Sequence, residues 1–279
     1  MNSTLCVSWN TRGLGSSTKR AAIRKQILKL KPGLIFIQES KRENVDIALI
    51  AQLCGRNSNF NYVFSPSTGA AGGLITCWDD DFFAQQNTSI HKRFIASVGI
   101  IKQIGLKCIA INLYAPNSHA ERKILWEELR EMLDRVKLPI LIGGDFNIVR
   151  SKSEKSGVHF HRSAMEEFES FIGDVGIIDL PLAGGAYTWS SNWEVPVFCR
   201  LDRFLLSADI LSKLPDITQK LGDCSVSDHK PIILCKSIQN RGPKPFRWFD
   251  HWADEEGYVK IVEKAATMAK GKGIVSFLD

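Results

Sequence analysis

The chain lacks the features that mark membrane-spanning, secreted and zinc-binding proteins. No run of about 18 apolar residues occurs among its 279 residues, so we expect no transmembrane helix and no membrane partner. The N-terminus has no basic segment followed by a long apolar one, so no signal peptide is expected. The seven cysteines are widely spaced and form no CxxC pair, which argues against a zinc site or a disulfide framework. We therefore expect a reducing, intracellular compartment.

The composition is that of a globular protein with a mild excess of positive charge. The chain is 44% hydrophobic and 24% charged, which is enough apolar material for one large domain or two small ones. The net charge of +6 is compatible with a polyanionic partner such as a nucleic acid. Nothing in the sequence indicates an obligate protein partner.

Short apolar runs with the length of strands recur along the chain, with helical periodicity between some of them. The expected strands are residues 5–9, 34–38, 62–65, 74–78, 95–101, 108–114, 140–143, 187–190, 203–206 and 231–235. The expected helices are residues 18–30, 118–136 and 163–172, with Ser118 and Ser163 as N-caps and Glu166 completing a capping box. Many strands with a few helices predict an α/β sandwich of two facing sheets with helices outside.

The composition changes after Ser237. Residues 240–245 are rich in turn-forming and charged residues, which is typical of a linker. We predict a domain over residues 1–237 and a linker with a truncated C-terminal extension over 238–279. The extension carries an aromatic cluster (Phe246, Trp248, Phe249 and Trp252), and its last part, residues 255–279, is expected to be less ordered than the core.

The most informative segment is the buried strand that ends at Gly143 and Gly144. Asp145 and Asn147 follow at once, and residues two apart on an extended backbone point to the same side. A carboxylate that holds a nucleophile or metal, beside an amide that orients an oxygen, is a plausible active-site pair. An Asp-x-Asn turn that caps its own backbone is the alternative interpretation.

Polar residues stand at the ends of several other predicted strands. If these ends meet at one edge of the sandwich, they form a single cluster, consisting of Asn10, Glu39, Tyr114, Asp145, Asn147, Asp202, Asp228 and His229. Glu39 and Asp228 offer the hard oxygen ligands that Mg²⁺ prefers. His229 beside a carboxylate such as Asp202 would be an oriented imidazole with its charged form favoured.

The remaining members of the predicted cluster suit hydrolysis of a phosphodiester. Asp145 can hold or deprotonate a water molecule, and Asn10 and Asn147 can orient the water, the phosphate or the catalytic carboxylate. Tyr114 can donate to a non-bridging phosphate oxygen. Each residue alone has a structural interpretation as a turn, surface or core residue, and their joint occurrence carries the hypothesis.

The order of these motifs resembles the endonuclease/exonuclease/phosphatase superfamily, which has the DNase I-like fold. The motifs are Trp9-Asn10, Gln38-Glu39-Ser40, Asn112-Leu113-Tyr114-Ala115-Pro116, Gly143-Gly144-Asp145-Phe146-Asn147, Arg200-Leu201-Asp202-Arg203-Phe204-Leu205 and Ser227-Asp228-His229-Lys230-Pro231. The resemblance covers roughly residues 4–237. It implies a four-layer α/β sandwich, with two facing mixed β-sheets flanked by helices.

The resemblance also implies a metal-dependent hydrolase of phosphoester bonds with defined residue roles. Asn10 and Glu39 would lie around the metal, Asp228 would help to bind it, and Tyr114 would touch the phosphate. The cofactor would be Mg²⁺, with Mn²⁺ as a substitute.

The same resemblance assigns the nucleophile and the imidazole. Asp145 and Asn147 would handle the nucleophile, and Asp202 would pair with His229.

Within the superfamily, the chain is most similar to the endonuclease domain of plant LINE-type (L1-like, non-LTR) retrotransposons. The similarity rests on residues 8–15, on residues 179–182 leading to 187–190, and on residues 245–249. It implies an endonuclease that nicks one strand of DNA, recognises groove shape more than base edges, and acts in the nucleus, with the cytoplasm as the alternative. Two hypotheses stay open beside it: action on abasic DNA or inositol phosphates, and an inert retrotransposon remnant that at most binds DNA.

One residue departs from the repair-enzyme pattern. Arg12 stands where repair-type abasic-site endonucleases carry an Asp near the metal, so a DNA phosphate is its expected partner. Arg12, Lys41 and Arg150 are the predicted substrate-binding residues. Further basic groups that could follow the phosphates are Lys19, Arg20, Arg42, Lys152 and Lys155.

Overall fold

The computed structural model describes residues 4–55, 59–69, 71–223 and 226–237, and the single positions 257, 260 and 264. The chain divides into two units, Met1–Ser237 and Ile238–Asp279, and the following description concerns the first. The predicted aromatic cluster at 246–252 lies outside the described residues, as does the tail over 255–279 apart from those three positions.

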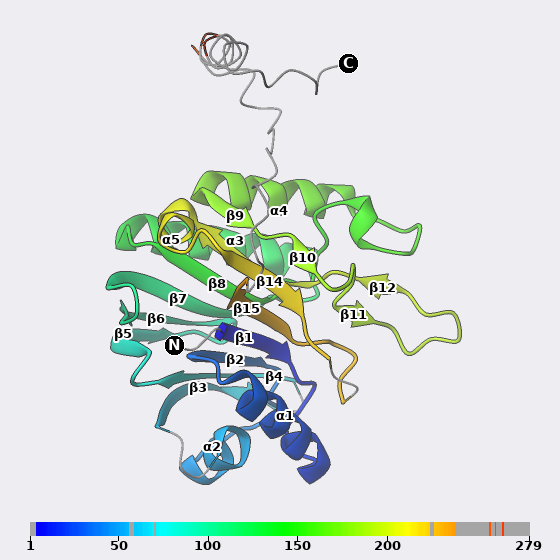
Figure 1. The fold of residues 1–279 in the computed structure, drawn as a ribbon. Helices are drawn as coiled ribbons and strands as arrows, with labels where there is room; N and C mark the ends of the chain where they lie inside the picture. The colour runs from blue at the N-terminus through cyan, green and yellow to red at the C-terminus, as the bar shows by residue number, and fades with distance from the viewer. Residues whose placement is uncertain are drawn as a thin grey trace, which may run out of the picture. The chain divides into compact units, whose positions relative to one another are not determined.

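The first large sheet has seven strands in the order β10-β14-β15-β1-β2-β4-β3 (Figure 1). Its strands are β1 (Thr4–Asn10), β2 (Leu34–Gln38), β3 (Phe60–Thr68), β4 (Ala71–Asp79), β10 (Leu182–Ala183), β14 (Ile217–Leu221) and β15 (Ile232–Lys236). β1 and β2 are parallel, whereas β1 and β15 are antiparallel, so the sheet is mixed.

The second large sheet has six strands in the order β5-β6-β7-β8-β13-β9. Its strands are β5 (Phe83–Ile90), β6 (Phe94–Ile101), β7 (Leu106–Tyr114), β8 (Ile140–Asp145), β9 (Ile177–Asp179) and β13 (Asp202–Ser207). A separate two-stranded ribbon is formed by β11 (Trp189–Ser190) and β12 (Phe198–Cys199). β7 and β8 are parallel and β13 is antiparallel to β8, so this sheet is mixed as well.

Helices cover the outer face of each sheet, as Figure 1 shows. The helices are α1 (Ser17–Leu30), α2 (Ile47–Cys54), α3 (His119–Val136), α4 (Arg162–Val175) and α5 (Ala208–Lys213), with a 3-10 turn at Lys152–Glu154. α1 and α2 pack on the first sheet in one hydrophobic cluster, and α3 and α4 pack on the second sheet in another. The predicted four-layer sandwich with two facing mixed sheets is confirmed.

The alternation of side chains along the strands explains why each large sheet has an apolar core on both faces, one shared between the sheets and one under its own helices. In β2, Phe36 points into the cluster between the sheets, where it joins Leu141 and Phe204 of the second sheet. Its neighbours Ile35 and Ile37 belong to the cluster under α1 and α2. A strand buried on both faces needs apolar residues at successive positions, which is why these segments read as continuous apolar runs.

Gly143 and Gly144 are required by close packing on both sides of β8. A Cβ on Gly143 would overlap the ring of Phe204 between the sheets. A Cβ on Gly144 would overlap the backbone carbonyl oxygen of Leu113 on the neighbouring strand β7. The absence of both side chains therefore lets β7, β8 and the opposite sheet approach each other just below Asp145.

A buried amide pair joins the two sheets below the same edge. Gln38 Nε2 of β2 donates to Asn112 Oδ1 of β7 at 2.7 Å and to Ser8 Oγ at 3.0 Å. Asn112 Nδ2 returns a bond to the carbonyl oxygen of Ile75 at 2.9 Å. Both amides are fully buried, so the hydrogen bond between them and their bonds to Ser8 and Ile75 fix the spacing of the sheets where the polar cluster begins.

A buried cluster of arginines and carboxylates, here called the arginine cluster, lies beside β13. It consists of Arg150, Arg200, Arg203, Glu154 and Asp179. Arg203 is fully buried and forms ion pairs with Asp179 at 2.6 Å and Glu154 at 2.9 Å. The arginine cluster thereby attaches the 3-10 turn at Lys152–Glu154 to strands β9 and β13.

Several local predictions need correction. α4 begins at Arg162, after His161, so Ser163 lies inside the helix and forms no cap; Glu166 binds Arg162 instead of completing a capping box. The predicted strand over 187–190 is shorter, because only Trp189–Ser190 pairs with β12. Ser118 does cap α3, since its side chain accepts from the backbone N–H of Glu121.

In the part of the chain that the structure describes, no helix is both long and apolar enough to cross a membrane.

Candidate active site

Strand direction brings the predicted polar residues to one edge of the sandwich. Asn10 lies opposite Gln38 in the register of β1 and β2, just before Glu39. In the second sheet Asp145 lies opposite both Tyr114 and Asp202. The parallel strands end at this edge and the antiparallel strands β13 and β15 begin there, so residues distant in sequence meet. Seven of the eight predicted residues are joined directly by the hydrogen bonds and ion pairs described next, and Asp228 is linked to Glu39 through Arg12.

Asn10 bridges two carboxylates that come from different sheets. Its fully buried Nδ2 donates to Glu39 Oε1 and to Asp145 Oδ2, each at 2.9 Å. Its own backbone carbonyl accepts from Ser227 Oγ at 2.9 Å, which holds the loop before His229 against β1. One amide therefore fixes the relative position of Glu39 and Asp145.

Asp202 orients His229 toward Asp145. His229 Nδ1 lies 2.9 Å from Asp202 Oδ2, and the same oxygen accepts from Thr188 Oγ1 at 2.6 Å. The opposite ring nitrogen, Nε2, lies 3.8 Å from Asp145 Oδ2. Because Nδ1 is bonded to Asp202, Nε2 is the nitrogen that faces Asp145.

Burial and mutual charge shift the pKa values of this pair. Burial raises the pKa of Asp145 to about 7, while His229 and the bond from Asn10 oppose the rise. Burial lowers the pKa of His229, but the carboxylates of Asp202 and Asp145 outweigh burial and raise it to about 9. Near neutral pH, a carboxyl group able to exchange a proton thus faces a positively charged imidazolium.

Asp228 and Glu39 share one arginine. Arg12 Nη2 lies 2.9 Å from Asp228 Oδ2, and Arg12 Nη1 lies 3.3 Å from Glu39 Oε1. Burial alone would raise the pKa of Asp228, but the hydrogen bond and charge of Arg12 hold it below its usual value. Trp189 Nε1 also donates to Asp228 Oδ2 at 3.1 Å.

Tyr114 completes the surroundings of Glu39. Its hydroxyl donates to Glu39 Oε1 at 3.0 Å. Burial and the charges of Glu39 and Asp145 hold the pKa of Tyr114 well above its usual value, so the phenol keeps its proton. A protonated phenol at this position can donate to an anionic ligand.

The donor set fits a hard divalent cation at Glu39 and Asp228. Their side chains are only 6% and 12% exposed, and both are anionic oxygen donors that already attract a cationic group. A second group of possible ligands, Asp145, Asp202 and His229, has donor atoms within 4.8 Å of one another. The raised pKa of His229 makes this second group less suitable, because a metal binds the neutral imidazole.

Asn147 does not extend from a strand in line with Asp145. It has φ +50°, in the left-handed region, and lies beyond the end of β8. Its backbone N–H donates to Asp145 Oδ1 at 2.9 Å, and its Nδ2 donates to the carbonyl oxygen of Ala115 at 2.6 Å. The period-two argument was therefore wrong for Asn147, and the Asp-x-Asn turn forms at the same position as the carboxylate of the site.

Backbone strain concentrates at this edge. Arg12, Glu39, Lys41 and Asn147 have positive φ although they are not glycines. Such conformations cost of order 1 kcal/mol each and persist only where the surroundings fix them. Of the described non-glycine residues with positive φ, the remaining two, Lys31 and Lys137, are helix C-caps.

The predicted substrate-binding residues are not free cations. Arg12 points inward to Asp228 and Glu39, and Lys41 Nζ lies 3.9 Å from Glu39 Oε2. Arg150 is part of the arginine cluster and also pairs with Glu169 at 2.6 Å. Two carboxylates, Glu169 and Asp179, therefore already pair with Arg150, and its role in substrate binding stays a prediction.

Other predicted basic groups also have protein partners. Lys19 Nζ donates to the carbonyl oxygen of Thr11, Arg20 binds the carbonyl oxygens of Leu14 and Gly15, and Arg42 binds that of Leu14. These bonds order the loop that carries Arg12.

Sequence reasoning missed the residues that support the site from the side. Thr188 holds Asp202, Trp189 holds Asp228, and Trp9 Nε1 donates to the carbonyl oxygen of His229 at 3.0 Å. All three were recognised only as members of motifs, Trp9 in Trp9-Asn10 and the other two in residues 187–190, without a role of their own. Thr188 and Trp189 lie just before the end of a predicted strand, which is the one sequence feature that could have drawn attention to them. The sequence does not indicate which residues they contact.

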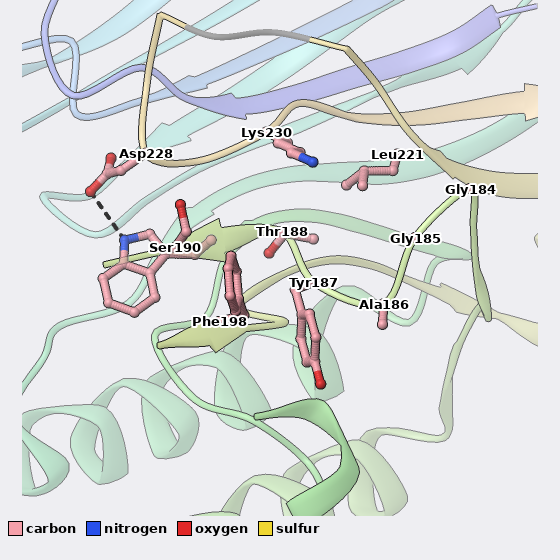
Figure 2. A pocket seen from close by; sticks show the side chains of 11 residues that line it. Gly184, Gly185, Ala186, Tyr187, Thr188, Ser190, Phe198, Leu221, Asp228 and Lys230 are labelled. Carbon is pink, nitrogen blue, oxygen red and sulfur yellow. Dashed lines mark hydrogen bonds between the residues drawn. The ribbon is translucent and has the colours of Figure 1, made fainter. Parts of the chain in front are cut away.

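A cavity of about 310 Å³ adjoins Asp228 (Figure 2). The rings of Tyr187 and Phe198 lie side by side in its wall, with centroids 5.9 Å apart, and Lys230 extends over it. Gly184 and Gly185 form part of the wall with backbone alone. The cavity therefore combines aromatic faces with one positive charge beside Asp228.

Comparisons with known proteins agree with this geometry. A family model described as "Endonuclease/Exonuclease/phosphatase family" matches residues 7–229. A search of the curated proteins finds no match.

Solved structures with the same fold include nucleases. The AP endonuclease LMAP from Leishmania major is 16% identical, with a TM-score of 0.67, covering 83% of this chain and 87% of that chain. An AP endonuclease from Archaeoglobus fulgidus is 16% identical, with a TM-score of 0.66, covering 84% and 99%. The endonuclease domain of TRAS1, a telomere-specific non-LTR retrotransposon, is 13% identical, with a TM-score of 0.61, covering 84% and 99%.

Proposed function

Because the chain belongs to the endonuclease/exonuclease/phosphatase family and is thus a hydrolase of phosphoester bonds, we propose that it is a Mg²⁺-dependent endonuclease that nicks one strand of DNA, as LINE-type retrotransposon endonucleases do. The observation that carries the proposal is the facing pair at the sandwich edge. Asp145 Oδ2 and His229 Nε2 lie 3.8 Å apart, and Asn10 ties Asp145 to Glu39.

Asp145 and His229 have different roles in the proposed hydrolysis. Asp145, with its pKa raised to about 7, accepts a proton from the attacking water. His229 is held as an imidazolium by Asp202 and donates from Nε2 to the phosphate, where negative charge develops. Tyr114, which keeps its proton, is a second donor to a non-bridging oxygen, and Asn147 is retained as an orienting group.

Glu39 and Asp228 are the residues that would hold Mg²⁺. When bound there, the ion would neutralise charge on the phosphate and the departing oxygen. Asn10 keeps Glu39 in place for this task, and Trp189 does so for Asp228.

Three observations support DNA as the substrate. The chain has a net charge of +6, which favours a polyanion. The cavity beside Asp228 offers Tyr187 and Phe198 as stacking surfaces for a base next to the cleaved phosphate. The TRAS1 domain, a retrotransposon endonuclease, shares the fold over nearly its whole length. We propose the nucleus as the site of action, with the cytoplasm as the alternative.

Abasic DNA is the second candidate substrate. It is favoured by the fold shared with two AP endonucleases. Arg12 argues against it, because a guanidinium stands beside Asp228 and Glu39 where repair enzymes of this type carry a carboxylate.

The experiment compares three substrates with the same protein preparation: supercoiled plasmid, an oligonucleotide with one abasic site, and an inositol phosphate. The proposal predicts Mg²⁺-dependent conversion of supercoiled plasmid to the nicked circle. Preferential cutting at the abasic site would favour the second candidate, and binding of DNA with no cleavage in Mg²⁺ or Mn²⁺ would favour an inert, DNA-binding remnant.

A further inference from the structure

Arg12 is the counter-ion of both predicted metal carboxylates. Its Nε and Nη2 bind Asp228 as a fork, with Nε 3.1 Å from each carboxylate oxygen and Nη2 2.9 Å from Oδ2. Its Nη1 reaches Glu39 Oε1 at 3.3 Å. All of the guanidinium nitrogens are therefore directed at the two residues that would hold the ion.

The backbone fixes this direction. Arg12 has φ +51°, and its N–H donates to Asn10 Oδ1 at 3.1 Å. The flanking residues bind the segment that carries Glu39: Thr11 N–H donates to the carbonyl oxygen of Gln38, and Gly13 N–H donates to that of Glu39. The loop and the segment are joined like neighbouring strands, so Arg12 is aimed at the carboxylates by the fold.

Nearby lysines do not duplicate this contact. Lys41 Nζ reaches only Glu39, at 3.9 Å, and has no ion pair with Asp228. Of the described residues, Arg12 alone forms ion pairs with both carboxylates. The Arg12 side chain is still 42% exposed, so it can turn outward without opening the core.

We propose that Arg12 is a built-in competitor for the divalent cation: it neutralises Glu39 and Asp228 until the cation arrives, and is then released to bind a DNA phosphate. The inference rests on the proposed function, since it needs the metal and the DNA. It follows from the contacts, because Arg12 occupies both oxygens of Asp228 and Oε1 of Glu39, and a divalent ion held by these two residues would compete for the same oxygens.

The proposal links the binding of metal to the binding of DNA. With the cation absent, Arg12 is unavailable to DNA; with the cation present, one more positive group faces the phosphates. By thermodynamic reciprocity, DNA must then also strengthen the binding of the cation. This coupling separates competition from a merely structural ion pair.

The first test measures Mg²⁺ binding without DNA, so it does not depend on activity. Mg²⁺ is titrated into the wild type and into Arg12→Gln, Arg12→Lys and the control Arg130→Gln, by calorimetry and by tryptophan fluorescence. Trp189 is a suitable reporter because its indole binds Asp228. Arg130 pairs with Asp174 on the outer helices and gives the same loss of charge away from the site.

We expect Arg12→Gln to bind Mg²⁺ about three- to tenfold more tightly, the value of a half-exposed ion pair. Arg12→Lys keeps the charge but loses the forked contact, so its Mg²⁺ affinity should lie between those of Arg12→Gln and the wild type. Arg130→Gln should match the wild type. Equal affinities in Arg12→Gln and the wild type would overturn the competition and leave the proposed function intact, whereas no Mg²⁺ binding by any variant would overturn both.

The second test measures DNA affinity against salt concentration in an Asp145→Asn background, in which we expect no cleavage. The salt slope is the slope of the logarithm of DNA affinity against the logarithm of salt concentration. In Mg²⁺, removal of Arg12 should reduce the magnitude of this slope by about one, because one phosphate contact is lost. In EDTA the slope should be the same with and without Arg12. If removal of Arg12 reduced the salt slope equally in Mg²⁺ and in EDTA, Arg12 would contact DNA without release by the cation. That result would overturn the coupling.

Discussion

Asp202→Asn tests whether Asp202 holds His229 in its charged form. The substitution keeps the shape of the side chain but removes the carboxylate charge that lies 2.9 Å from Nδ1. His229 would keep a hydrogen-bond partner while losing the largest of the interactions that raise its pKa. The variant therefore isolates the charge of Asp202 from its packing.

The size of the effect follows from the balance at His229. Its pKa is raised from 6.5 to about 9 in the folded protein. That difference favours the imidazolium by roughly 3 kcal/mol. Without Asp202, burial acts against the charge with only Asp145 and Asp228 to oppose it, so the pKa should fall to 6.5 or below. His229 would then be neutral at the pH of the reaction.

The sign of the pH dependence can be stated in advance. Because the folded pKa of His229 is above its unfolded value, the resulting stability is fully present below pH 6.5 and is lost as the pH rises through about 9. The wild type should therefore lose unfolding free energy across that window, and Asp202→Asn should show a flatter profile there.

The assay is an NMR titration of the His229 ring protons, assigned with His229→Gln, together with urea unfolding at a series of pH values. The account predicts a titration midpoint well above the ordinary histidine value in the wild type and at or below it in Asp202→Asn. An unchanged midpoint in the variant would refute the role given to Asp202. A wild-type midpoint near 6.5 would refute the charged imidazole itself.

Two further predictions concern the scaffold. Arg203→Met should leave the carboxylates of the arginine cluster without their buried partner and cost about 3–5 kcal/mol of stability, which lowers the melting temperature by roughly 6–20 °C for a domain of this size. Arg135→Met removes an exposed arginine and should leave the melting temperature unchanged. Equal melting temperatures of the two variants would contradict the structural role of Arg203. Gly144→Ala should cost at least about 1–3 kcal/mol because its Cβ would overlap the carbonyl oxygen of Leu113. Gly15→Ala meets open space and is the matched control, so equal unfolding midpoints of the two glycine variants would show that β7 and β8 are not in close contact at Gly144.

The layered fold was predictable because its strands are buried on both faces. Such strands appear as apolar runs, and β2 coincides with the predicted residues 34–38. β5 and β14 were missed, since polar residues interrupt them and they lack a continuous apolar run. Ser163 was misread because a capping residue and a residue in the first helical turn look alike in sequence.

The meeting of the site residues was predictable, but their contacts were not. Position at strand ends was enough to gather Asn10, Asp145 and His229, because strand direction decides which ends share an edge. The inward turn of Arg12 depends on a left-handed backbone at a non-glycine residue, which no sequence pattern marks. The support from Thr188 depends on a pairing between segments that only the fold defines.

The central claim is that the edge carrying Asp145 and His229 cleaves phosphodiester bonds with the help of a divalent cation. The most direct measurement is nicking of supercoiled plasmid by the wild type and by Asp145→Asn, each with Mg²⁺ and with EDTA. The account predicts nicked circles only for the wild type in Mg²⁺, with Asp145→Asn folded but inactive. Equal nicking by Asp145→Asn, or undiminished nicking by the wild type in EDTA, would contradict it.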